Sequence, residues 1–122
     1  MGVDFNTKIP IYMQIMNLIK RDIVTGKLKP GDKIPSVREM ATELQVNPNT
    51  LQRAYQELER LGITYTQRGM GTFVREDMNM IDGLKKEMAR EIINSFIEGM
   101  KNLGFNKEEI VKIVEDKVKE EF

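Results

Sequence analysis

The stretch Ser36–Gly62 constrains the fold more than any other part of the chain, because it has the pattern of two short helices joined by a tight turn. Ser36 and Glu39 have the Ser-x-x-Glu spacing of a capping box, which predicts that a helix begins there. Gln45 and Val46 then turn the chain. The apolar face predicted for this helix has the spacing i, i+3, i+4 and i+7 and comprises Val37, Met40, Ala41 and Leu44.

A second helix is predicted to begin after Asn47, which is placed to cap it, with Pro48 at the first helical position, where a missing N–H costs nothing. Gly62 is expected to end this helix in a left-handed conformation. Its inward stripe is predicted to be Leu51, Ala54, Tyr55, Leu58 and Leu61. Its opposite face carries amides and arginines, namely Asn49, Gln52, Arg53, Gln56 and Arg60. Such side chains match adenine and guanine edges in a major groove, so the pattern favours a helix-turn-helix whose second helix reads DNA; the alternative is an ordinary solvated face.

The rest of the first part of the chain has the pattern of a scaffold helix and a β-hairpin. A helix is expected from Pro10 to about Thr25, preceded by an arm at residues 1–8 from which Val3 and Phe5 dock. Its apolar side is expected to contain Ile11, Ile15, Leu18, Ile19 and Ile23. Residues 29–32, Lys-Pro-Gly-Asp, predict a turn. Two β-branched and aromatic runs, residues 63–66 and 72–74, surround a glycine-containing loop and predict a hairpin. Three helices and such a hairpin form a winged helix-turn-helix.

From residue 76 onward the pattern predicts a helical hairpin. Apolar residues recur every three or four positions and are the candidate dimerisation residues: Ile81, Leu84, Met88, Ile92, Phe96 and Met100, with Ile110 and Val114 on the second helix. Gly104 is expected to end the first helix and Asn106 to cap the second. The expected fold is therefore mainly α with one small β-hairpin: a DNA-binding domain at residues 1–75 and a dimerisation tail at residues 76–122.

Composition restricts the function. The 122 residues include no Cys and no His, which removes disulfides, thiol nucleophiles, the usual zinc sites and His-based acid–base catalysis. No nucleophile–base pair stands out, so we expect no catalytic residue, no metal and no cofactor. No apolar run approaches the ~18 residues of a membrane span, and the start lacks a signal-peptide pattern. A cytoplasmic, nucleoid-associated protein without a membrane partner is expected.

Charge is balanced overall but divided unevenly along the chain. Residues 1–75 carry eleven Lys and Arg against seven Asp and Glu, or +4, whereas residues 76–122 carry eight against twelve, or −4. Contact with phosphates needs local positive charge, so the first part is the better candidate for binding DNA. The tail has more apolar surface than it can bury by itself, so this surface needs a partner. Two explanations remain: a packed dimer interface without a ligand, or a site for an unidentified small-molecule effector.

Three motifs resemble the DNA-binding domain of GntR-family bacterial regulators. These are G-x-L-x-P-G-D-x-I-P-S-V-R-E at residues 26–39, V-N-P-N-T-x-x-R-A-Y at residues 46–55 and R-G-x-G-T-x-V at residues 68–74. The short helical tail is similar to that of the YtrA-type branch. This resemblance implies a tail used for dimerisation and a regulator that often represses its own operon together with transporter genes. The histidines with which some branches bind a metal are absent.

The resemblance also implies roles for individual residues. Arg38 corresponds to the family's arginine on the second helix of the domain, and Gly69 and Arg68 correspond to the wing glycine and its neighbour. Pro48 departs from branches with a basic or hydroxyl residue there; because proline has no donor, base reading is expected to shift to Arg38 and to residues 49, 52 and 53. The candidate DNA-binding residues are Ser36, Arg38, Asn47, Pro48, Asn49, Thr50, Gln52, Arg53, Arg68 and Gly69.

We therefore expect a sequence-specific transcriptional regulator, a dimeric repressor that binds double-stranded operator DNA with an inverted repeat. A winged-helix module that binds proteins without reading DNA is the alternative. Nearly complete absence of carboxylates from the predicted reading face favours DNA. An enzyme is the weakest hypothesis.

Overall fold

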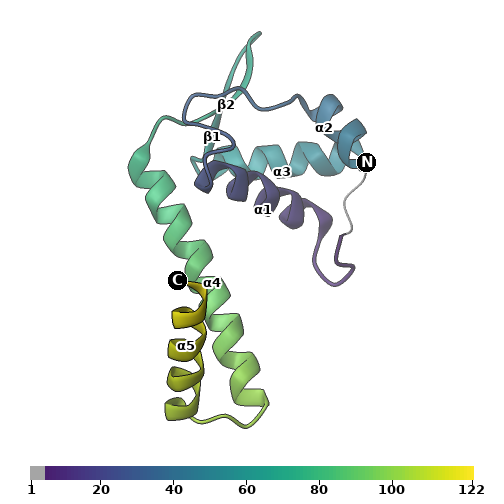
Figure 1. Cartoon of the computed structure of the whole chain (residues 1–122). Helices are drawn as coiled ribbons and strands as arrows, with labels where there is room; N and C mark the ends of the chain where they lie inside the picture. The colour runs from purple at the N-terminus through teal and green to yellow at the C-terminus, as the bar shows by residue number, and fades with distance from the viewer. Residues whose placement is uncertain (1–4) are drawn as a thin grey trace. The chain divides into compact units, whose positions relative to one another are not determined.

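The computed structural model describes residues 5–122, which form five helices and one two-stranded antiparallel sheet (Figure 1). The elements, in chain order, are α1 (Ile11–Val24), α2 (Val37–Leu44), α3 (Pro48–Arg60), β1 (Thr64–Gln67), β2 (Gly71–Val74), α4 (Met78–Asn102) and α5 (Lys107–Glu121). The chain separates into two compact units, Met1–Lys85 and Lys86–Phe122, and the division falls within α4. The mainly α fold with a small hairpin is the predicted one. Val3, the predicted docking residue of the arm, lies outside the described residues, whereas Phe5 is half-buried.

The core of the first unit forms where α1 and α2 pack on α3 and the hairpin closes one side. Its buried apolar side chains include Ile15, Met16, Ile19, Ile23, Ile34, Ala41, Leu51, Ala54, Leu58, Ile63 and Val74. The predicted inward stripe of α3 is buried except at Leu61, which is 47% exposed. That prediction was wrong because α3 ends at Arg60 and Leu61 is its C-cap, where the chain turns away at Gly62 with φ +77°.

Local capping explains where the helices begin. The hydroxyl of Ser36 accepts the N–H of Glu39, whose carboxylate accepts the N–H of Ser36, both at 3.1 Å, so the predicted capping box is confirmed. Asn47 caps α3 with Pro48 at the first helical position, also as predicted. Pro10 differs slightly from expectation, because it is the N-cap residue of α1 with ψ 136° and not part of its first turn. Gln45 makes the turn between α2 and α3 with a left-handed φ of +55°.

The hairpin forms a wing that projects from the helices of the first unit (Figure 1). Thr64 pairs with Val74 at its base, and Gln67 pairs with Gly71 near its tip. Residues 31–34 lie along the other edge of β2, because the N–H of Ile34 donates to Thr72 O at 2.9 Å and the N–H of Val74 donates to Asp32 O at 2.8 Å. The loop before α2 is therefore fastened to the wing.

The second unit contains the end of α4 and all of α5, which runs back after a reversal at Gly104 (φ +90°). Asn106 and Glu109 form the predicted capping box of α5. Within Lys86–Phe122, which the structure describes completely, Ile110 is the one buried residue. The large apolar side chains left exposed in this unit are Ile92, Ile93, Phe96, Ile97, Leu103, Val111, Ile113, Val114, Val118 and Phe122.

Among the residues described, no helix combines the length and the apolar character that crossing a membrane requires.

Candidate DNA-binding surface

The start of α3 presents polar side chains to solvent. The side-chain oxygen of Asn47 accepts the N–H of Asn49 at 2.8 Å, which satisfies one of the free donors at the helix start. Asn49 and Gln52 are exposed, and Thr50 is half-buried. Because the opposite face of α3 is fixed in the core by Leu51 and its neighbours, the amide-bearing face is held outward on a rigid element. Amides in such an arrangement are able to donate to and accept from base edges.

Arg53 lies on the same exposed face but is held by the first helix. Its guanidinium carbon is 3.9 Å from the centroid of the Tyr12 ring, a close cation–π stack between the second turn of α3 and the first turn of α1. In the described part of the chain, Arg53 forms no ion pair with a carboxylate. The side chain therefore keeps its charge uncompensated while one face is covered by an aromatic ring.

Arg60, at the far end of the predicted face, is engaged differently. Its guanidinium forms an ion pair with Glu57 at 2.7 Å, and the hydrogen bond from Nε to Glu57 raises the pKa of Arg60 above its ordinary value. Because this charge is neutralised within α3, the part of the face with free charge and amides is limited to Asn49, Gln52, Arg53 and Gln56.

The start of α2 supplies Ser36 and Arg38. The backbone N–H of Ser36, and then its hydroxyl, hold the pKa of the Glu39 carboxyl below its ordinary value. Arg38 is exposed in the first turn, and its side chain makes no hydrogen bond or ion pair with any described residue. A free guanidinium at this position is able to donate bidentately to guanine or to a phosphate.

The wing carries Arg68 and Gly69 at its tip. The N–H of Met70 donates to Gln67 O at 2.9 Å, and Gly69 takes a φ of +79°, a conformation that glycine adopts without strain. Arg68 is exposed. The wing is tied to the end of α3 because the N–H of Thr66 donates to the carboxylate of Glu59 at 2.7 Å. The wing and α3 are thus parts of one unit.

Two residues of this region were missed by sequence reasoning. Tyr12 looked like an ordinary helix position, and its contact with Arg53 depends on how α1 packs on α3. Lys33 is exposed and crosses Gly71, where an added Cβ would lie 2.6 Å from the Lys33 Cε. No local pattern could have revealed either contact, because the partners are about forty residues apart in sequence.

Comparison with known proteins gives consistent results. The family model described as bacterial regulatory proteins, gntR family, matches residues 11–74. The uncharacterised HTH-type transcriptional regulator YhcF of Bacillus subtilis is 49% identical over 112 residues, which cover 92% of this chain and 93% of that protein. The HTH-type transcriptional repressor YtrA of the same organism is 41% identical over 104 residues, covering 80% of each chain.

Solved structures agree with the sequence comparison. A GntR family transcriptional regulator from Listeria monocytogenes superposes with a TM-score of 0.83 at 47% identity, covering 92% of this chain and 98% of that one. The DNA-binding domain of AraR in complex with operator ORR3 matches with a TM-score of 0.53 at 34% identity, covering 61% of this chain and 87% of that one. The chain therefore belongs to the GntR family of bacterial regulatory proteins and is a DNA-binding transcriptional regulator.

Proposed function

We propose that this regulator is a dimeric, sequence-specific repressor that inserts the start of α3 into the major groove of an inverted-repeat operator. The observation that carries the proposal is the exposed, carboxylate-free face of α3 around Asn49, Gln52 and Arg53, on a helix whose other face is buried. In this arrangement Asn49 and Gln52 contact bases, and Arg38 contacts a guanine from α2.

The remaining candidate residues are assigned to the DNA backbone and the flanking groove. Ser36, Asn47 and Thr50 lie at or near the starts of α2 and α3, where N–H groups and short polar side chains suit phosphate oxygens. Pro48 offers no donor and packs against the backbone. Arg68, presented by Gly69 on the wing, enters the adjacent minor groove or holds a phosphate. The AraR domain, solved in complex with an operator, supports DNA binding by the shared fold.

Dimerisation through the tail is the second part of the proposal. Burying an exposed apolar side chain stabilises an association by about 1.5–3 kcal/mol, and this tail exposes many of them at helical spacing. Ile81, Leu84 and Ile110 are only 8%, 6% and 7% exposed in the single chain, so we assign the contact mainly to residues around them. The assigned residues are Met88, Ile92, Phe96, Met100 and Val114.

A two-fold dimer explains why the operator is expected to be an inverted repeat. Two reading helices related by such an axis meet equivalent half-sites about 34–36 Å apart, or a multiple of that distance, on one face of DNA. The 41% identical relative is named a repressor, which supports repression as the sign of regulation. By resemblance to the YtrA-type branch, we extend the proposal to repression of the regulator's own operon together with transporter genes.

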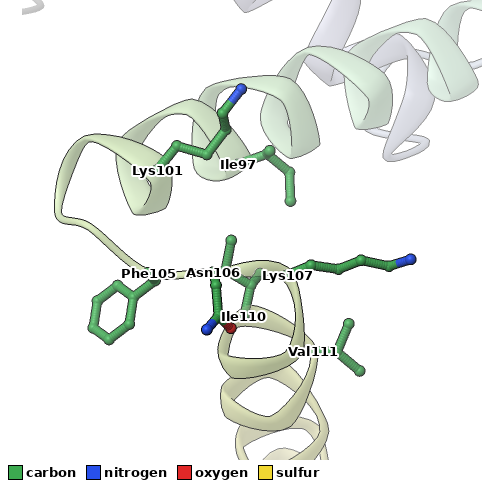
Figure 2. A pocket seen from close by; sticks show the side chains of 7 residues that line it. All are labelled: Ile97, Lys101, Phe105, Asn106, Lys107, Ile110 and Val111. Atoms are coloured by element: carbon green, nitrogen blue, oxygen red, sulfur yellow. The ribbon is translucent and has the colours of Figure 1, made fainter.

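A small-molecule effector is the second candidate role of the tail, and one observation favours it. A cavity of about 400 Å³ opens between the end of α4 and the start of α5 (Figure 2). Ile97 points toward the start of α5, whereas Lys101 carries its amino group away from α5 (Figure 2). An apolar effector bound there would act by changing the spacing of the two reading units.

Selection of bound duplexes from a random DNA pool tests the function. We expect the purified chain to enrich an inverted repeat and to bind it as a dimer at moderate ionic strength. A chain that enriches no sequence would instead support the winged-helix protein-binding module. A monomer that binds single half-sites would contradict the proposed dimerisation but not the proposed reading of DNA by α3. Thermal-shift screening of apolar compounds tests the effector, and failure of every compound to stabilise the protein would count against it.

A further inference from the structure

Tyr12 and Arg53 form the one aromatic–guanidinium contact between two helices within residues 5–122. Their separation of 3.9 Å places the guanidinium directly against the ring face. A stack of this kind uses only the face of the planar group. Its five N–H donors lie in the plane and point outward from the edge, so they stay available to an acceptor.

The start of α1 is itself held in place, which makes Tyr12 a firm support. The side-chain amide of Gln14 donates to Asn6 O at 2.6 Å and to Ile9 O at 2.7 Å. Its oxygen accepts the N–H of Asn6 at 2.7 Å. These bonds fasten residues 6–9 against the first turn of α1, the turn that carries Tyr12. The Tyr12 ring is thus attached to a backbone segment whose preceding residues, Asn6 and Ile9, are hydrogen-bonded to Gln14 in the same helical turn.

The second exposed arginine of α3 provides an internal comparison. Arg60 meets a carboxylate of its own helix, Glu57, which neutralises its charge. Arg53 lies on the same face but is fixed by a neutral ring, so its position is restricted while its full charge remains. An aromatic support costs a DNA-binding arginine nothing in electrostatic attraction to phosphate, whereas a carboxylate support would cancel much of it.

We infer that Tyr12 is a positioning residue for DNA recognition, which acts by holding the guanidinium of Arg53 with its N–H edge toward the duplex. This inference rests on the proposed use of α3 as the reading helix. Without the ring, Arg53 would sample several rotamers and would lose side-chain entropy on binding. Restricting it beforehand favours the bound state, and α1 becomes part of the DNA-recognition machinery without touching a base.

A double-mutant cycle on the full chain tests the inference. The probe is the duplex enriched most strongly from the random pool, and the variants are Tyr12→Leu, Tyr12→Phe, Arg53→Ala and the Tyr12→Leu/Arg53→Ala double variant. Tyr12→Leu should raise the Kd about three- to tenfold, the range expected when one rotamer-rich side chain must be immobilised on binding. Tyr12→Phe, which keeps the ring, should bind as the unsubstituted chain does. In the Arg53→Ala background, Tyr12→Leu should cost nothing further.

Two outcomes would overturn the inference without contradicting the proposed role of α3 as the reading helix. One is an equal loss from Tyr12→Leu with and without Arg53, which would make Tyr12 a general structural residue. The other is a selected duplex bound equally well by Tyr12→Leu and by the unsubstituted chain. Failure to enrich any duplex would instead contradict the proposed function.

A measurement without DNA checks the contact itself. The δ-methylene and ε-NH resonances of Arg53 should show an upfield ring-current shift that Tyr12→Leu abolishes and Tyr12→Phe keeps. Absence of this shift in the unsubstituted chain would overturn the inference whatever the DNA results. Melting temperatures of all variants, measured alongside, show whether Tyr12→Leu remains folded, and Arg60→Ala serves as the matched control for removing an arginine from the same face.

Discussion

The phenolic O–H of Tyr55 donates a 2.6 Å hydrogen bond to the backbone carbonyl of Pro35. This bond joins the middle of α3 to the residue that precedes the cap of α2, twenty positions earlier in the chain. It holds the start of α2 close to α3, because Ser36 and Arg38 follow Pro35 directly. One side chain therefore joins the two helices of the helix-turn-helix.

Tyr55→Phe should lower the free energy of unfolding by about 1 kcal/mol, because the Pro35 carbonyl loses its donor while the ring stays packed. Burial raises the pKa of Tyr55 above its ordinary value of 10.0. The folded state thus keeps a proton that the unfolded chain loses, and the stability contributed by Tyr55 is complete below pH 10 and declines above it. Urea unfolding from pH 8 to 11 measures this, and identical pH profiles for both proteins would contradict it.

Ser36→Ala should destabilise the protein by about 1 kcal/mol, since the Glu39 N–H loses its acceptor at the start of α2. Ser36→Thr, which keeps the hydroxyl, is the control. The pKa of Glu39 is lowered in the folded state, so its stabilising effect is present above its ordinary pKa and is lost as the pH falls through the folded value. Thermal unfolding at pH 7 measures the penalty, and a loss for Ser36→Thr as large as that for Ser36→Ala would contradict the cap. The pH dependence from Glu39 should be similar in both proteins, because its carboxylate is held mainly by the backbone N–H of Ser36, which the substitution keeps.

Arg38→Ala should weaken binding to the selected operator far more than binding to random DNA, with a difference of about 1–3 kcal/mol if the guanidinium contacts guanine bidentately. Arg60→Ala is the matched control, because Arg60 is already paired with Glu57 and should have little effect. Fluorescence anisotropy titrations at several salt concentrations measure both. Equal losses on operator and random DNA, with a reduced salt slope, would show that Arg38 holds only a phosphate.

Two glycine substitutions should have opposite effects on stability. Gly71→Ala should destabilise the wing by about 1–3 kcal/mol, because Gly71 has φ +124°, a backbone conformation that is strained for a residue with a Cβ, whereas the nearby end of the Lys33 side chain can move aside. Gly83→Ala should stabilise α4 by about 0.5–1 kcal/mol, because Gly83 is inside a helix and an added Cβ there meets nothing within 4 Å. Chemical denaturation compares the two variants, and destabilisation by Gly83→Ala would indicate a tight contact at this position in the assembled protein.

Ile92→Glu should convert the proposed dimer into monomers, because Ile92 is 70% exposed in the single chain and is assigned to the partner interface. Asn94→Glu is the control, since it adds the same charge to the opposite side of the same helix. Sedimentation velocity measures the association, and circular dichroism verifies the helices. A dimer that survives Ile92→Glu would move the interface to another face of the tail.

Most element boundaries could be predicted from the sequence because they depend on interactions within four residues. The caps at Ser36, Asn47 and Asn106 and the glycine at the end of α3 need no distant partner, and all appear as expected. The ion pair of Arg60 with Glu57 is equally local, at i and i+3, and could have been predicted from spacing alone. The exposed polar face of α3 could be predicted for the same reason, since helical periodicity assigns each side of the helix; its contact with bases stays a prediction.

The tertiary structure decided which distant residues contact these side chains. The stack of Tyr12 on Arg53, the bond of Tyr55 to Pro35 and the pairing of residues 31–34 with β2 join segments that lie far apart in the chain. Such contacts depend on how the helices pack, and the periodicity of one helix does not predict the angle at which it packs on another. Sequence alone therefore determined the helices, their caps, the polar face of α3 and the local pairing of Arg60 with Glu57, whereas packing placed Tyr12 against Arg53 and Tyr55 against Pro35, because the angle between two helices depends on contacts between distant residues.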